Sequence, residues 1–113
     1  MATIKSYTDL EQSKKLAEIL PIESADLYYY KYGLPHFIEG QGDYESIRSD
    51  KYHDYIPCWS LAALLNVLPS STLDSSDNHR YRFRCMERYT EWYDNAIDAC
   101  VAMIEKLHEL KIL

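Results

Sequence analysis

The sequence predicts an α+β fold in which a small antiparallel sheet packs against about three helices. Two periodicities predict it. Apolar residues recur every three to four positions in residues 8–20 and 95–110, as they do along one face of a helix, and residues 57–68 form a compact apolar block that begins with a proline. In residues 80–86 apolar side chains alternate with arginines at every second position, as on the two faces of a strand, and residues 26–32 are rich in Tyr, which is common in strands. No long helical crossover joins adjacent strands, which favours antiparallel pairing.

The three helices are predicted at about residues 8–20, 57–68 and 95–110. Thr8 is the expected N-cap of the first, with Glu11 three positions later completing a capping box. The second lies between Pro57 and Pro69 and has almost no polar face, so we expect it at the centre of the core. Asn95 is the expected N-cap of the third, whose apolar residues then follow a helical period.

The Tyr-rich stretch is the first predicted strand. Alternation places Tyr28, Tyr30 and Tyr32 on one of its faces. A turn that contains Gly and Pro follows, so residues 36–39 are expected to return as a second, short strand. A large ring that carries a hydroxyl suits a half-buried sheet face, which is how we interpret these tyrosines.

Two polar stretches are expected to be loops. Residues 40–55 contain Gly and several Asp and Ser, which predicts a surface loop, and residues 70–78 are assigned to a loop by composition. At 113 residues, of which 47% are hydrophobic and 27% charged, the chain has the size and composition of one folded domain. We therefore expect a single globular domain over residues 1–113.

The charge balance restricts the possible partners. The chain has 18 acidic and 12 basic residues and a net charge of −6, which disfavours direct binding to nucleic acid or to an anionic membrane. Its longest nearly apolar run, residues 56–69, is too short to span a bilayer, and no apolar segment of a signal peptide is present near Met1. Three widely spaced cysteines fit unpaired thiols in a reducing compartment. The expected location is the cytoplasm.

No motif predicts a catalytic, cofactor or metal site. No two Cys or His residues lie within four positions of each other, so the ligand spacing of a zinc site is missing. Cys58 alone suggests an enzyme, because the dipole of the predicted second helix would stabilise its thiolate, as in papain-type thiol hydrolases. Such a mechanism also needs a base, for which His79 or His108 is the candidate. A small, buried and inert Cys58 is the favoured interpretation.

Three arginines form the candidate partner-binding site. Arg80, Arg82 and Arg84 lie on the face of their predicted strand opposite its apolar side chains. Three guanidinium groups on one strand face can bind a carboxylate, a phosphate or an acidic partner. The alternative is a solvated face on which Glu87 or Glu91 pairs with them across the strands.

Three segments carry a resemblance to other sequences: residues 11–21 continued by 23–26, residues 56–69, and residues 94–100 followed by 103–109. They resemble small uncharacterised proteins of Bacteroides-type gut bacteria and their mobile elements. The resemblance implies a similar fold and a cytoplasmic setting, and it transfers no activity and no catalytic residue. Residues 33–56 do not match the pattern, and Ala96 stands where such relatives often carry Pro.

These observations favour a non-enzymatic accessory protein that acts by binding another protein and needs no cofactor. The small size and a surplus of Tyr, 11 residues, beside the arginines support this interpretation, because both residue types are common at interfaces. Two other functions stay open: a small thiol hydrolase that uses Cys58, and an acidic mimic that binds the basic, nucleic-acid-binding surface of a partner. The sequence leaves the partner and the oligomeric state open.

Overall fold

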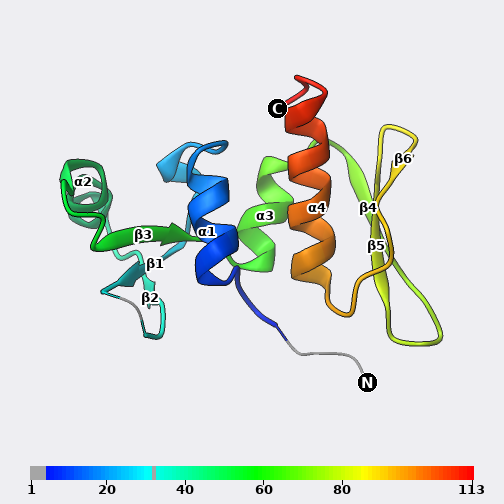
Figure 1. The fold of residues 1–113 in the computed structure, drawn as a ribbon, viewed down its shortest axis with the longest axis horizontal. Coiled ribbons are helices and arrows are strands. Elements are labelled where there is room, and N and C mark those ends of the chain that lie inside the picture. The colour runs from blue at the N-terminus through cyan, green and yellow to red at the C-terminus, as the bar shows by residue number, and fades with distance from the viewer. Residues whose placement is uncertain (1–4, 32) are drawn as a thin grey trace.

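The computed structural model describes residues 5–31 and 33–113. Within them the chain folds into four α-helices and two three-stranded antiparallel sheets (Figure 1). The helices are α1 (Leu10–Ala17), α2 (Gln41–Ser49), α3 (Leu61–Val67) and α4 (Ala96–Glu109), with a short 3-10 helix, η1 (Ile22–Ser24). The strands are β1 (Leu27–Tyr30), β2 (His36–Phe37), β3 (Tyr55–Cys58), β4 (Ser71–Ser75), β5 (Tyr81–Cys85) and β6 (Arg88–Tyr89). The α+β class is confirmed, but the strands form two sheets where one is predicted.

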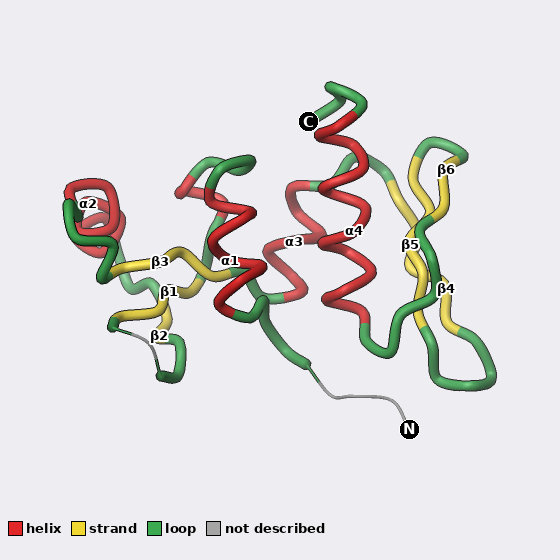
Figure 2. The backbone as a smooth tube through the Cα atoms, in the orientation of Figure 1, coloured by secondary structure: helices red, strands yellow, loops and turns green. Residues whose placement is uncertain are grey.

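The elements are arranged along the long axis of a molecule that measures 42 × 33 × 21 Å, in an order that differs from their order in the sequence (Figure 1). Figure 2 shows α2 and the first sheet, in the order β2-β1-β3, at one end, with α1 and α3 in the middle. At the other end, α4 lies against one face of the second sheet, in the order β4-β5-β6 (Figure 1). Among the described residues no helix or strand covers the opposite face of that sheet.

The first helix is shorter than the predicted stretch 8–20, and its N-cap is Asp9, one residue after the predicted cap Thr8. The carboxylate of Asp9 accepts a hydrogen bond from the Gln12 N–H at 2.8 Å, and the Gln12 side chain accepts one from the Asp9 N–H at 3.1 Å. The predicted capping box that starts at Thr8 is therefore wrong. Thr8 is fully buried, and its hydroxyl accepts a hydrogen bond from the Trp59 N–H instead.

The predicted helix 57–68 is wrong at its N-terminal end. Pro57 and Cys58 belong to β3, which pairs antiparallel with β1. The helix begins only after Ser60, whose hydroxyl accepts a hydrogen bond from the Ala63 N–H at 3.3 Å. A proline is compatible with β3 because this strand lies at the edge of its sheet. Cys58 consequently lies in a strand and not in the first turn of the following helix, where the predicted dipole stabilisation would act.

Both stretches predicted as loops contain regular structure. Within 40–55 lies α2, which is fixed by buried Ile47 and by the Tyr44 hydroxyl, which donates to the Ala25 carbonyl at 3.0 Å. Within 70–78 lies β4, which pairs with β5 along its whole length. The polar composition of both stretches predicts loops, because the signals that define the helix and the strand are pairing and packing with distant parts of the chain.

The Tyr-rich strand is present as β1, and its predicted alternation is confirmed within the described residues. Leu27 and Tyr29 are buried on one face, whereas Tyr28 and Tyr30 lie on the other. Tyr32, which the prediction assigns to the same face as Tyr28 and Tyr30, lies outside the described residues. The predicted second strand exists as β2, which is only two residues long and pairs with the first half of β1.

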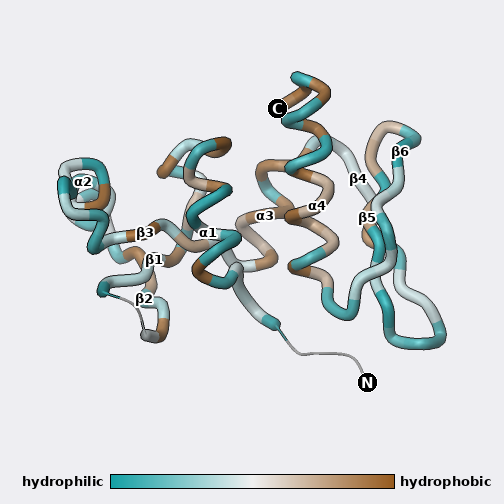
Figure 3. The backbone as a smooth tube through the Cα atoms, viewed as in Figure 1, coloured by the Kyte–Doolittle hydropathy of each residue, from teal (hydrophilic) through white to brown (hydrophobic). Residues whose placement is uncertain are grey.

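The main core lies between α3, α4 and β5, where Figure 3 shows α3 and the middle of α4 to be mostly apolar. Asn95 caps α4 as predicted, since its side chain accepts a hydrogen bond from the Asp98 N–H at 2.8 Å. The fully buried side chains of this core include Leu16, Trp59, Leu64, Phe83, Ile97, Cys100, Met103, Ile104 and Leu107. A second and smaller cluster lies on one face of the first sheet and consists of Leu27, Tyr29, Ile56 and Cys58.

Candidate protein-binding face on the second sheet

The second sheet has one buried and one exposed face. Phe83 and Cys85 point toward the core and are almost completely buried. The strand register places Arg82 beside Asp74, and Arg84 between Thr72 and Tyr89, on the side away from α4. We call this surface the outer face; it consists of Thr72, Asp74, Arg82, Arg84, Tyr89 and Trp92.

Arg82 is held at the centre of the outer face by three groups. Its Nε lies 3.1 Å from Asp74 Oδ2 on the neighbouring strand. Its guanidinium carbon lies 4.4 Å from the ring centre of Tyr89 and 4.7 Å from that of Trp92, which are cation–π distances. The side chain retains 33% of its exposure, so it is less accessible than strand alternation predicts. Stacking and the ion pair therefore fix both the arginine and the two aromatic rings.

Arg80 lies just before β5 and reaches the same region from outside the strand. Its Nη2 donates a hydrogen bond to the Trp92 carbonyl oxygen at 2.7 Å, and its Nε lies 3.7 Å from Asp94 Oδ1. About half of the side chain is exposed, since its exposed fraction is 49%. Arg80 thus ties the segment that carries Trp92 to the start of β5.

Arg84 is exposed beside a shallow depression of about 500 Å³ at the end of the hairpin β5–β6. Met86 and Tyr89, which also line the depression, are 53% and 43% exposed. Within residues 5–31 and 33–113, Arg84 takes part in no ion pair. The depression therefore combines an accessible guanidinium group with an accessible apolar surface.

The structure places Arg82 and Arg84 on the outer face and Arg80 beside it, just before β5, and it adds partners that the sequence does not predict. Asp74 pairs with Arg82, whereas Glu87 or Glu91 are the partners expected from the sequence. The sequence predicts a loop over residues 70–78, which gives Asp74 no position beside a strand. Only the pairing of residues 71–75 with β5 identifies this strand, because its sequence, Ser-Thr-Leu-Asp-Ser, contains a single apolar residue.

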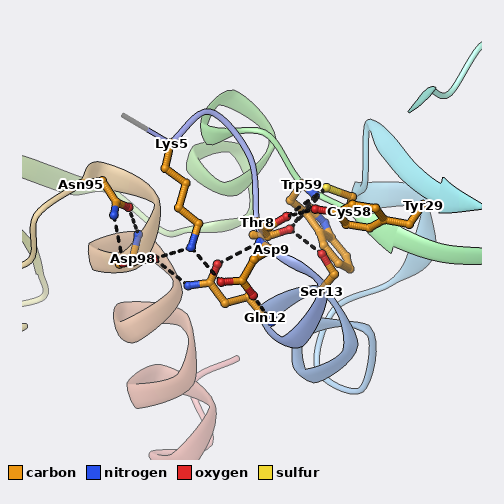
Figure 4. A network of polar contacts seen from close by, with 10 residues as sticks. All are labelled: Lys5, Thr8, Asp9, Gln12, Ser13, Tyr29, Cys58, Trp59, Asn95 and Asp98. Carbon is orange, nitrogen blue, oxygen red and sulfur yellow. Dashed lines mark hydrogen bonds and ion pairs between the residues drawn. The ribbon is translucent and has the colours of Figure 1, made fainter. Parts of the chain in front are cut away.

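The environment of Cys58 does not favour an attacking thiolate. It is fully buried in β3, and its sulfur contacts Thr8 twice (Figure 4). The Thr8 hydroxyl donates a hydrogen bond to Sγ at 3.6 Å, and Sγ lies 3.4 Å from the Thr8 carbonyl oxygen. Burial raises the pKa of the Cys58 thiol, although hydrogen bonds from Thr8, Ser13 and Tyr29 act in the opposite direction. His79 and His108, the proposed bases, are both exposed on other elements. Burial therefore favours the thiol over the thiolate at Cys58.

The other two cysteines have the same character. Cys85 is 1% exposed and Cys100 is fully buried, and all three thiols are unpaired. Burial raises the pKa of Cys85, and it raises the pKa of Cys100 to about 12. Each of these residues therefore packs as a small apolar side chain.

Polar contacts join the N-terminal ends of α1 and α4. Lys5 Nζ lies 2.9 Å from Asp9 Oδ2 and 2.8 Å from Asp98 Oδ1, and the Gln12 side chain donates to the same Asp98 oxygen at 2.8 Å (Figure 4). Asn95 Nδ2 donates to the other Asp98 oxygen at 2.9 Å. Each of these side chains therefore has partners within the chain, and we interpret the cluster as a structural joint between the two helices.

Two further properties bear on function. Throughout residues 5–31 and 33–113, no three His, Cys, Asp or Glu side chains are grouped in a way that would hold a metal ion. In the same residues no helix is long and apolar enough to cross a membrane.

No protein-family model matches the chain, and neither a curated protein nor a solved structure is significantly similar to it.

Proposed function

We propose that the chain is a non-enzymatic accessory protein of the cytoplasm that binds another protein through its outer face. The observation that supports this function best is Arg82, whose guanidinium group lies over the rings of Tyr89 and Trp92 beside an exposed Arg84. Arg, Tyr and Trp are the residue types most enriched among those that dominate the binding energy of protein interfaces. Side chains that are already fixed also lose little conformational freedom when a partner binds.

The partner segment that fits this surface carries a carboxylate next to an apolar side chain. Asp74 and Asp94 lie beside Arg82 and Arg80, so these two arginines already have carboxylate neighbours. Arg84 is the guanidinium group available for a carboxylate of the partner, which it can bind through two parallel hydrogen bonds. The adjacent apolar residue would pack in the depression beside Arg84.

Affinity capture from the native cell tests the proposal when two triple variants are compared. Replacing Arg80, Arg82 and Arg84 with Ser removes two positive charges from the outer face and a third, that of Arg80, from beside it. Replacing three exposed lysines, Lys14, Lys15 and Lys51, with Ser changes the net charge by the same amount elsewhere on the surface. We expect a partner that the wild type and the lysine variant capture and the arginine variant does not, as measured by mass spectrometry.

Two outcomes would contradict the proposal. Capture that persists in the arginine variant would place the interface elsewhere. Equal loss in both variants would indicate a general effect of charge, because the two carry the same formal charge. The melting temperature of each variant shows whether it is folded.

The geometry gives less support to the thiol hydrolase, one of the two alternative functions. A thiol hydrolase requires an accessible thiolate, whereas Cys58 is buried and its pKa is raised. Slow reaction of a thiol reagent with the native protein, and fast reaction after unfolding, is the expected result; rapid stoichiometric labelling of native Cys58 would favour the hydrolase. An acidic mimic requires accessible carboxylates; Asp74 and Asp98 are engaged in ion pairs within the chain, whereas others, such as Glu11, Glu18 and Glu45, are exposed, so this alternative stays open.

A further inference from the structure

The free edge of β4 is the longest open strand edge of the two sheets within the described residues. β4 is five residues long and pairs with β5 on one side only. Edge strands are commonly protected by proline, by lysine or by being very short. β4 contains no Pro or Lys, and its single charged residue, Asp74, is bonded to Arg82 on the neighbouring strand.

The edges of the first sheet are protected in the ways that β4 lacks. In β3, Pro57 has no N–H, and the Tyr55 N–H already donates to Asp50 Oδ2 at 2.7 Å. At the opposite edge, β2 is only two residues long. The exposed backbone of β4 is therefore specific to the second sheet.

The backbone groups of β4 that point to the free edge follow from the bonds of β5. Phe83 directs its backbone toward β6, since its carbonyl accepts from the Thr90 N–H at 3.0 Å and its N–H donates to Thr90 Oγ1 at 2.8 Å. In antiparallel pairing, the residue opposite Phe83 must then direct its own N–H and C=O away from β5. That residue is Leu73.

The same reasoning extends to the ends of β4. Tyr81 exchanges backbone hydrogen bonds with Tyr93, at 2.7 and 2.6 Å, so its partner Ser75 also points outward. By alternation Ser71 does too. Three residues, Ser71, Leu73 and Ser75, thus present an N–H and a C=O each at the free edge.

We propose that this edge pairs with the β4 edge of a second copy of the chain, antiparallel, about a twofold axis at Leu73. In that register Leu73 exchanges two hydrogen bonds with its own counterpart, and Ser71 of each copy exchanges two with Ser75 of the other, about six in all. A shift by one residue would place inward-pointing groups opposite outward-pointing ones. A shift by two would leave a pair of outward groups without partners. Among these twofold-symmetric registers, the one that satisfies every outward group is therefore the one with its axis at Leu73.

The side chains are compatible with this pairing. Thr72 of each copy would lie opposite Asp74 of the other, where a hydroxyl can donate to a carboxylate. Leu73 would meet its counterpart on the inner face, the side on which it packs against the main core. No like charges would lie directly opposite each other, although each chain carries a net charge of −6. The two outer faces would become one continuous surface on a six-stranded sheet.

Sedimentation velocity over a range of protein concentrations tests the dimer. We expect the wild type to approach twice the 13.3 kDa of one chain at high micromolar concentration. Ser75→Pro removes an outward N–H and adds a ring at the edge, and it should raise the dimer dissociation constant about tenfold or more. Ser75→Ala loses the same hydroxyl but keeps the N–H, so it should behave as the wild type. A monomeric wild type, or equal weakening by both variants, would overturn the proposal.

A cysteine pair tests the register and does not depend on whether the proline variant folds. Leu73→Cys places two thiols on the axis, where the α-carbons are about 5.5 Å apart and a disulfide can form. In Ser75→Cys the two thiols are offset by four residues along the paired strands, because Ser75 lies opposite Ser71 of the other copy, and a disulfide cannot span that offset. The native cysteines are buried and do not interfere. We expect Leu73→Cys alone to become a covalent dimer on mild oxidation; a dimer from Ser75→Cys, or from neither variant, would contradict the register.

Discussion

The two three-stranded sheets are built on different supports. The first sheet covers a small cluster of four buried residues and is linked to α1 by buried hydrogen bonds around Thr8. The second is attached directly to the main core through Phe83 and Cys85. The first has protected edges, whereas the second leaves both an edge and a face exposed. A sheet that is anchored on one face by a large core can keep its other surfaces available for binding.

Phe83→Ala should have the largest effect, because it removes the main attachment of the second sheet. Phe83 is fully buried in the main core, and such a truncation costs about 3–5 kcal/mol of unfolding free energy. Tyr89→Ala removes an aromatic ring from the exposed side of the same sheet and should cost about 1 kcal/mol. Chemical denaturation measures both. Similar losses in the two variants would mean that the outer face, too, is part of the structural core.

Thr8→Val should destabilise the first sheet through its hydrogen bonds, because it keeps the shape of the side chain and removes the hydroxyl. The Trp59 N–H and the Ser13 hydroxyl would lose their partner inside the protein, at a cost of about 1–3 kcal/mol. Thr72→Val is the same substitution on exposed β4 and should change the unfolding free energy by less than about 0.5 kcal/mol. An equal effect at both positions would contradict the contrast between the sheets.

Asp98→Asn should produce the smallest effect, which depends on pH. Burial raises the pKa of Asp98, but hydrogen bonds from Lys5, Gln12 and Asn95 outweigh it, so the net pKa lies below the ordinary value. A depressed pKa contributes stability above the unfolded-state value, about pH 4, which is lost as the pH falls through the folded-state value. The variant should therefore be less stable than the wild type at neutral pH, and the difference should shrink in acid.

Melting temperatures measured from neutral to acidic pH provide the test. Asp77→Asn, in an exposed loop, controls for the change of net charge. A difference between Asp98→Asn and the wild type that stays constant with pH would show that the joint between α1 and α4 does not depend on the charge of Asp98.

The sequence predicted those elements whose signals are local. The N-cap at Asn95 and the alternation of β5 depend on neighbouring residues, and both are found in the structure. The cap of α1 was misplaced because Thr8 and Asp9 are adjacent and both are capping residue types, and only the burial of Thr8 distinguishes them. β4 was missed because a polar strand is defined by its partner.

The candidate site was predicted in part for the same reason. Alternation along one strand is sufficient to place Arg82 and Arg84 on one face. The residues that fix Arg82 come from three other segments: Asp74 from β4, Tyr89 from β6 and Trp92 from the stretch before α4. Their association depends on the strand register, which the sequence of one strand does not contain.

The two tryptophans lie in different environments, so their fluorescence reports on two different regions of the protein. Trp59 is fully buried, and its indole N–H donates to Ser24 Oγ at 3.0 Å, whereas Trp92 is 36% exposed and stacked on Arg82. A water-soluble quencher should therefore reduce the emission of Trp92 and spare that of Trp59 until the chain unfolds. A ligand that covers the outer face should protect Trp92 from the quencher. One emission spectrum thus follows occupancy of the surface and integrity of the interior at the same time.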